Sequence, residues 1–265
     1  MKHLFICLLA ATFALSASAQ QQVSKDVLVK KAGTLATIIP PDELCQITHL
    51  RVVGKINGDD IRWIRKMAGA TDNSDSIDYK WGQLVDLDLN EVEIVKGKAT
   101  YLDARSTEKW RHSTTYSTKS GKYKSSSSFS DSYDLSKPLT PEQWKEFRST
   151  IGTKQVGRFY TIDDQGYVTA HYTTENNILG FYMFDGCVSL QRLILPSGIQ
   201  LIRTRAISNC HALQKIAIPA QCGGVQEYGI TDCHSLELVL FLNPKTRYKP
   251  RNFYNCSPAI QIQRK

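Results

Sequence analysis

Four cysteines recur at a fixed spacing, and this spacing constrains the fold more than any other feature of the chain. Cys187, Cys210, Cys233 and Cys256 are separated by 23 residues three times over. Apolar residues share the period in four aligned sets: Phe184, Ile207, Ile230 and Phe253; Leu190, Leu213 and Leu236; Leu193, Ile216 and Val239; Leu195, Ile218 and Phe241. A constant period of this length indicates a repeat architecture.

A single 23-residue unit has too few apolar side chains to offset the entropy lost on ordering it, so the units must stack. The last part of each unit alternates apolar and polar residues, which predicts a short strand with one buried face. Strands of successive units would pair at ~4.8 Å and align equivalent apolar residues in ladders. We therefore expect an α/β-type repeat solenoid, a curved stack with a short parallel sheet.

Weaker copies of the same rhythm precede the regular units. A helix is predicted between the first two of them, with a turn at Asn57-Gly58, Asp59 or Asp60 as N-cap and Gly69 at its end. We expect this capping helix to cover the open edge of the first strands. The weaker copies are Ile47, Leu50 and Val52; Leu84, Leu87 and Leu89; and Tyr167, Ala170 and Tyr172.

The regular units resemble those of the BspA-like leucine-rich-repeat family of bacterial surface proteins. The matching segments are FDGCVSLQRLILP (184–196), ISNCHALQKIAIP (207–219) and ITDCHSLELVLFL (230–242). AGTLATIIP and ITHLRVVGKINGDDIRWIRKMAG (47–69) resemble the N-terminal region of such proteins. The resemblance implies a leucine-rich-repeat fold in an exported interaction protein, and in some members adhesion to host matrix proteins.

Residues 1–19 have the features of a signal peptide. Lys2 is followed by an apolar run over residues 4–15, and Ala17-Ser18-Ala19 provides small residues for cleavage. No later stretch has the 18 or so apolar residues that would span a bilayer. We therefore expect export to the cell surface, the exterior or the periplasm, which argues against a nucleic-acid partner.

Residues 101–160 interrupt the repeats and are interpreted as an insertion between an N-terminal repeat-like cap region (20–100) and the regular repeats with a C-terminal cap (161–265). In residues 113–132, twelve of twenty residues are Ser or Thr. A mobile loop is expected there, because so polar a stretch buries little apolar surface. A hairpin turning at Ser120-Gly121 is the alternative.

A short helix is predicted at the end of the insertion. Thr140 would be its N-cap, Pro141 its first residue and Gln143 the partner in a capping box. We expect one apolar face of this helix to dock the insertion onto the solenoid. That face consists of Trp144, Phe147 and Ile151.

Two surfaces are candidates for binding. If Leu193 and Leu195 face inward, the alternate side chains face outward, and exposed apolar rows usually need a partner or a cover. We therefore predict protein binding through Arg192, Ile194, Lys215, Leu238 and Leu240, unless the inserted loop covers them.

The alternative is binding of an acidic or neutral polysaccharide, or another polyanion, through the insertion. That surface mixes aromatic rings with cations in Trp110, Arg111, Lys119, Lys122, Tyr123 and Lys124. A basic run at Lys245, Arg247, Lys249 and Arg251 would extend it. A solvated basic loop without a dedicated partner is the simplest interpretation of the insertion.

The remaining patterns do not indicate an enzyme. Cys187, Cys210, Cys233 and Cys256 are interpreted as small buried side chains, since neighbouring rungs lie further apart than a disulfide requires. Cys45 and Cys222 have no evident partner. Zinc is disfavoured for Cys210-His211 and Cys233-His234 because no C-x-x-C pair is present. No hydrolase, metalloprotease or P-loop motif occurs, so no catalytic residue, metal or cofactor is expected.

Overall fold

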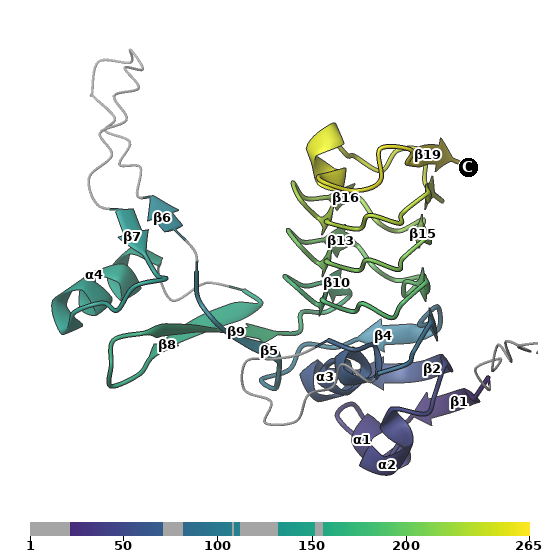
Figure 1. The fold of residues 1–265 in the computed structure, drawn as a ribbon, viewed down its shortest axis with the longest axis horizontal. Coiled ribbons are helices and arrows are strands. Elements are labelled where there is room, and N and C mark those ends of the chain that lie inside the picture. The colour runs from purple at the N-terminus through teal and green to yellow at the C-terminus, as the bar shows by residue number, and fades with distance from the viewer. Residues whose placement is uncertain (1–21, 71–81, 108, 112–131, 152–155) are drawn as a thin grey trace, which may run out of the picture.

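The computed structural model describes residues 22–70, 82–107, 109–111, 132–151 and 156–265 of the chain. These residues form a stack of coils and a lobe that projects from one side of the stack (Figure 1). The lobe is built from the described residues between 100 and 173. In the sequence it therefore lies between the N-terminal strands and the regular repeats.

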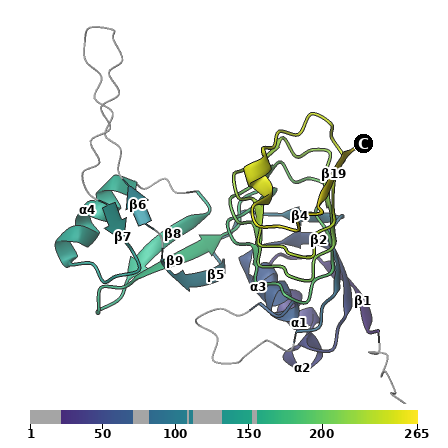
Figure 2. The same cartoon turned by 45° about the horizontal axis from the view of Figure 1, so that its top comes forward.

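One parallel sheet runs along the whole stack. Its strand order is β1-β2-β3-β12-β15-β18-β19, and β4 also pairs with β2. Figure 2 shows the coils that connect these strands lying one above another. The strands are β1 (Ser24–Val29), β2 (His49–Ile56), β3 (Asp86–Asp88), β4 (Val92–Ile94), β12 (Arg192–Ile194), β15 (Lys215–Ile218), β18 (Leu238–Phe241) and β19 (Gln261–Arg264).

The register of this sheet repeats without a shift. Leu193 pairs with Ile216, which pairs with Val239. Leu87 and Leu50 continue the same row through β3 and β2. All five side chains are at most 2% exposed, so the row is a ladder through the core. The predicted stacking of 23-residue units is confirmed, and so are the weak copies in β2 and β3.

Two narrower parallel sheets close each coil. Their orders are β10-β13-β16 and β11-β14-β17. Between the second of these and the next strand of the long sheet, the chain turns with positive φ at Gly186, Asn209, Asp232 and Asn255. Gly, Asn and Asp adopt this conformation at the lowest cost. The strands are β10 (Ile178–Leu179), β11 (Phe184–Asp185), β13 (Leu201–Ile202), β14 (Ile207–Ser208), β16 (Gly224–Val225) and β17 (Ile230–Thr231).

Helix α3 (Gly58–Met67) forms where the sequence predicts a helix, but its N-cap differs. The side chain of Asn57 accepts a hydrogen bond from the Asp59 backbone N–H at 3.0 Å. The Asp60 carboxylate accepts one from the Asn57 N–H, also at 3.0 Å. Asn57 therefore caps the helix, and Asp60 completes the capping box.

Helix α3 connects β2 to β3 and so lies inside the stack. The edge strand of the long sheet is β1, and α1 (Leu35–Ile38) and α2 (Pro41–Leu44) lie at the same end of the stack (Figure 1). This placement differs from the expected cover over the first strands. At the other end, a short 3-10 helix (Pro250–Phe253) precedes β19.

The lobe contains antiparallel strands instead of coils. Strands β5 (Thr100–Arg105), β8 (Arg158–Ile162) and β9 (Val168–Thr173) form one sheet in the order β5-β9-β8. The prediction of a repeat strand at Tyr167, Ala170 and Tyr172 is therefore wrong. β9 alternates apolar and polar residues as a repeat strand does, but it pairs with its hairpin neighbour across the turn at Gly166.

The lobe has its own hydrophobic core. Helix α4 (Pro141–Ile151) is capped as predicted, since the Thr140 and Gln143 side chains each accept a hydrogen bond from the other residue's backbone N–H. Its apolar face packs inside the lobe and not onto the solenoid, which corrects the expected docking. Phe147 is fully buried there, among Tyr133, Leu135, Leu139 and Val168, with Trp144 and Ile151 at the margin.

The insertion is described only in part. Strands β6 (Lys109–Arg111) and β7 (Ser132–Asp134) pair in antiparallel fashion. The predicted loop or hairpin around Ser120-Gly121 and the predicted signal peptide lie outside the described residues.

Candidate functional site

The outer sheet face is the surface on which the five predicted protein-binding residues lie. Arg192, Lys215 and Leu238 occupy one row across β12, β15 and β18, and Ile194, Ala217 and Leu240 occupy the row two residues further on. Arg192 and Lys215 are exposed, and the other four side chains are partly exposed. The structure thus brings Arg192, Ile194, Lys215, Leu238 and Leu240 together, as predicted.

Charge on this face changes along the stack. Arg192 donates to Asp86 of the neighbouring strand at 2.7 Å, so its charge is partly compensated. Arg51, nearer the N-terminal end, forms ion pairs with Glu91 and Asp26. Toward the C-terminal end the rows become apolar at Leu238 and Leu240. The lobe leaves the stack on the side away from β15 (Figure 1), so its described part does not cover this face.

The residues predicted for polyanion binding are placed only in part. The backbone of Trp110 and Arg111 forms strand β6. Lys119, Lys122, Tyr123 and Lys124 lie outside the described residues.

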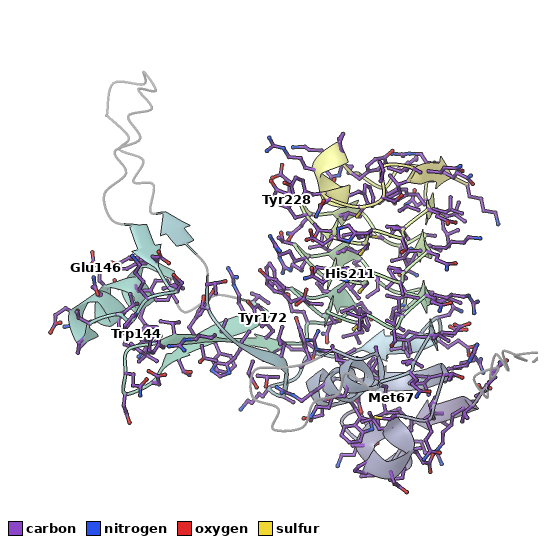
Figure 3. All side chains as sticks on the ribbon, viewed as in Figure 1. Met67, Trp144, Glu146, Tyr172, His211 and Tyr228 are labelled. Carbon is purple, nitrogen blue, oxygen red and sulfur yellow. The ribbon has the colours of Figure 1, made fainter. Side chains whose placement is uncertain are left out.

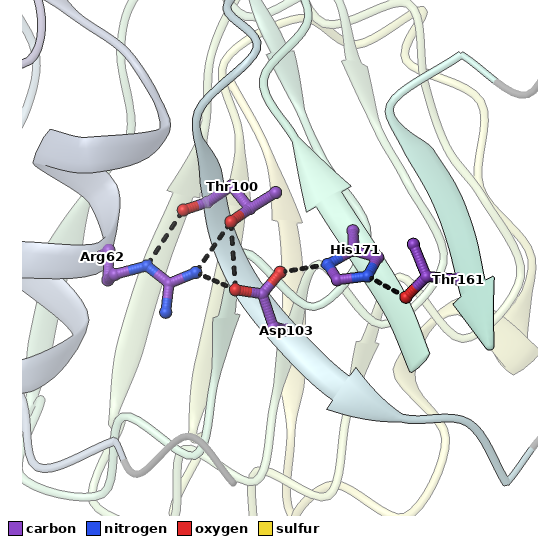
Figure 4. A network of polar contacts seen from close by, with 5 residues as sticks. All are labelled: Arg62, Thr100, Asp103, Thr161 and His171. Carbon is purple, nitrogen blue, oxygen red and sulfur yellow. Dashed lines mark hydrogen bonds and ion pairs between the residues drawn. The ribbon is translucent and has the colours of Figure 1, made fainter. Parts of the chain in front are cut away.

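A polar network that the sequence does not reveal joins the lobe to the stack (Figure 4). The Asp103 carboxylate of β5 contacts His171 Nδ1 of β9 at 2.7 Å, and His171 Nε2 contacts Thr161 Oγ1 of β8 at 2.7 Å. Arg62 of α3 donates to Asp103 at 2.6 Å and to Thr100. The network therefore connects α3 to all three strands of the lobe sheet.

The electrostatics of the network favour an ionised Asp103. Partial burial raises the pKa of this carboxyl group, but hydrogen bonds from His171 and Arg62 outweigh burial and lower the pKa overall. A carboxylate, an imidazole and a hydroxyl in series resemble the relay that activates a nucleophile in some enzymes. Such an enzyme also needs hydrogen-bond donors beside the hydroxyl, to stabilise an oxyanion. The neighbour of His171 on the exposed face is instead the Phe159 ring, which stacks on the imidazole with 4.6 Å between the centroids. We interpret the network as a structural joint.

Replacing Asp103 with Asn is expected to destabilise this joint by about 2 kcal/mol, because charge-assisted hydrogen bonds to two partners are weakened. The folded-state pKa of Asp103 lies below its usual value of 3.8. Its carboxylate therefore stabilises the fold above pH 3.8, and the contribution is lost as the pH falls through the folded-state value. Denaturant unfolding of both proteins as a function of pH measures the difference.

Asp26→Asn is the matched control for this prediction. Asp26 is an exposed carboxylate that lies 3.6 Å from Arg51, and such surface pairs contribute little. A loss of stability that is equal in the two variants, or that persists unchanged below the folded-state pKa of Asp103, would contradict the role of the network.

The cysteines of the ladder are free thiols. Cys187, Cys210 and Cys233 are fully buried, and Cys256 is half-buried in the last coil. Contacts with the thiols of Cys187 and Cys233, together with burial, raise the pKa of Cys210 well above its usual value. A protonated buried thiol is a poor nucleophile and a poor metal ligand. Cys45 and Cys222 are also free.

The histidines next to the ladder cysteines point the other way. His211 and His234 are exposed and stack on each other at 5.1 Å between ring centroids. Across the described part of the chain, no three His, Cys, Asp or Glu side chains gather as a metal ion would require.

The fold and the surface together define a class of protein. A stack of parallel coils with an internal leucine ladder is a leucine-rich-repeat solenoid, in which function is carried by residues displayed on the coils. The family model described as BspA type Leucine rich repeat region matches residues 164–263, in six copies. This part of the chain is therefore similar to BspA-type leucine-rich repeats.

Repeats of this family are typically non-enzymatic protein-interaction modules, and the family is typically found at the cell surface or outside the cell. The matched range includes β9, whereas the parallel coils begin at β10. No curated protein is significantly similar to the chain. None of the helices in the described ranges is long and apolar enough to cross a membrane.

Proposed function

We propose that the protein is an exported, non-enzymatic binding module that recognises an extracellular or host protein through the outer sheet face. The observation that carries this proposal is the contiguous apolar patch formed by Ile194, Ala217, Leu238 and Leu240 on adjacent strands. Strands in register hold these side chains in a fixed arrangement, so little further ordering is needed on binding.

The composition of the patch fits a protein partner better than a small molecule. Its centre is apolar, and the exposed cations Arg192 and Lys215 lie at its margin, which is the usual anatomy of a protein interface. Small ligands generally require a concave site. An adhesin-like role toward matrix proteins agrees with this composition.

Export and the division of the chain belong to the same proposal. Export rests on the signal-peptide features of residues 1–19. The boundaries at 20–100, 101–160 and 161–265 rest on the interruption of the repeats. The separate core of the lobe supports treating the inserted residues as a unit of their own, and Val168 in that core extends the unit beyond residue 160.

Leu240→Asp is expected to weaken binding to the protein partner about a hundredfold or more, because it places a charge within the apolar patch. Arg192→Glu should act in the same direction, since it sets an acid beside Asp86. The measurement is surface binding of the purified protein to collagen, laminin and fibronectin at physiological salt, followed by titration of each variant against the protein that binds.

Leu28→Asp provides the matched control, because Leu28 is a 55% exposed leucine of β1, on the edge strand at the other end of the same sheet. Deletion of residues 113–131, which spares β7, should also leave binding unchanged. Equal loss in Leu240→Asp and Leu28→Asp, or loss on deletion of the insertion alone, would move the interface away from the outer sheet face.

A further inference from the structure

A second row of side chains follows one corner of the stack. Tyr182, Arg205, Tyr228 and Arg251 are spaced by 23 residues, and we call them the corner ladder. Backbone hydrogen bonds connect each to the next: from Tyr182 N to Arg205 O at 3.1 Å, from Arg205 N to Tyr228 O at 2.7 Å and from Tyr228 N to Arg251 O at 3.0 Å. Aromatic and cationic side chains therefore alternate along the corner at ~4.8 Å per step.

The backbone at this corner is unfavourable for the residues that occupy it. Tyr182, Arg205 and Tyr228 have φ values of 56°, 55° and 58°. Bulky residues rarely adopt this left-handed conformation, which costs on the order of 1–3 kcal/mol. The opposite turn of each coil uses Gly, Asn or Asp under the same constraint. Backbone preference therefore does not explain Tyr and Arg at the corner ladder. Tyr182 packs against the core, which accounts for its large side chain, whereas Arg205 is exposed and its side chain has no such structural role.

Aromatic rings lie against both ends of the corner ladder. Tyr254, which is 58% exposed, lies edge-on to Tyr228 at 5.4 Å between centroids and extends the surface. Tyr172 of the lobe sheet lies edge-on to Tyr182 at 5.3 Å but is buried in the core, so it packs against Tyr182 and presents no ring to a ligand. Tyr172 and Tyr228 both lie on the side of the stack from which the lobe projects (Figure 3). The accessible surface thus runs from Tyr182, which is partly exposed, along the stack to Tyr254 in the last coil.

The cations of the corner ladder are available for a ligand. Arg203, two residues before Arg205, is held by the buried Glu175 in a bidentate pair. Lys249 lies 3.9 Å from Glu227. Arg205 and Arg251 are exposed, and neither has an acidic partner among the described residues. The acidic side chains of this corner therefore compensate other cations and leave these two charges free to attract an anion.

We propose that the corner ladder binds an extended acidic polysaccharide. A tyrosine ring can contact the apolar face of a sugar ring while its hydroxyl forms hydrogen bonds. An arginine fork pairs with a carboxylate or sulfate group. A straight ridge suits a linear polymer, and an excess of 33 basic over 25 acidic residues assists its approach. An acidic peptide would use the arginines but gain little from the rings. The proposal concerns a surface separate from the outer sheet face and does not rest on its function.

The test is binding of the purified protein to immobilised chondroitin sulfate, with neutral dextran and poly-L-glutamate as comparison polymers. The double variant Arg205→Asn with Arg251→Gln removes both free charges and should weaken binding about tenfold. Tyr228→Asn should weaken binding to chondroitin sulfate but not to poly-L-glutamate. Asn suits the left-handed backbone, so Arg205→Asn alone should not lower the thermal unfolding midpoint.

Arg192→Gln with Lys215→Gln is the matched control, because it removes two charges from the outer sheet face. It should change binding less than about twofold. Equal weakening in both double variants would show attraction by net charge and overturn the proposal. Absence of binding to chondroitin sulfate at low salt would also overturn it. Binding of poly-L-glutamate as tight as that of chondroitin sulfate, and unaffected by Tyr228→Asn, would assign the corner to acidic peptides instead.

Discussion

Phe147→Ala is expected to unfold the lobe while the stack stays folded. Phe147 is fully buried at the centre of the lobe core, and its ring contacts Tyr133 and Tyr160 edge-on at 5.6 Å each. Truncating a buried phenylalanine costs about 3–5 kcal/mol through lost burial and the cavity left behind. Among the described residues, the lobe core contains five buried apolar side chains, of which three are fully buried, so a loss of this size is a large fraction of its stability.

Hydrogen exchange of the backbone amides measures this effect part by part. Amides of β8 and α4 should lose protection in Phe147→Ala, whereas those of β15 and β18 should keep it. Phe159→Ala is the control of the same type in the same lobe, because Phe159 is 46% exposed and its loss should cost far less. Uniform loss of protection across the lobe and the stack would show that the two cores unfold as one unit.

Arg65→Met should destabilise the junction between the N-terminal part and the regular coils by about 3 kcal/mol. Arg65 of α3 is 2% exposed and donates to the backbone carbonyls of Tyr182, Met183 and Asp185 at 2.9, 3.3 and 3.0 Å. Methionine has a similar length but no donor, so these buried carbonyls would lose a charge-assisted partner. Denaturant unfolding followed by circular dichroism measures the change in free energy.

Lys98→Met is the control for this prediction, since Lys98 is an exposed cation on the segment that leads into β5. It should change stability by less than about 0.5 kcal/mol. Similar losses of stability in the two variants would mean that Arg65 contributes no more than an exposed cation does. That result would contradict a role for its hydrogen bonds at the junction.

The sequence was most informative where the chain repeats. A period of 23 residues determines which side chains face inward, because strands that stack without a register shift repeat the same burial in every coil. The ladder of Leu193, Ile216 and Val239 and the position of Leu240 on the outer face follow directly. The capping box of α4 is also readable, since it depends only on Thr140 and Gln143.

The lobe was not predictable in the same way, because its contacts join residues far apart without a period. Asp103 and His171 meet only once β5 and β9 pair, and no local pattern gives that pairing. A signal for β8 and β9 did exist: alternating residues flank the turn that ends at Gly166. The same signal also fits a degenerate repeat, since a short alternating strand looks alike in parallel and antiparallel sheets.

The corner ladder could have been found from the period alone. A step of 23 from Tyr182 reaches Arg205, Tyr228 and Arg251, but alternating Tyr and Arg residues do not stand out beside the apolar and cysteine positions that share the period. The left-handed backbone at three of these residues is visible only in the structure.

The regular coils have equal length and pair without a register shift, so every surface along the stack grows in steps of one coil. One more coil of 23 residues would lengthen the stack by ~4.8 Å, and it would add a rung to the outer sheet face and to the corner ladder together. The reach of one surface can therefore not be changed without changing the other. Duplication of a single coil is the smallest change that alters this reach while preserving both ends of the stack, so the two surfaces would lengthen in step during evolution.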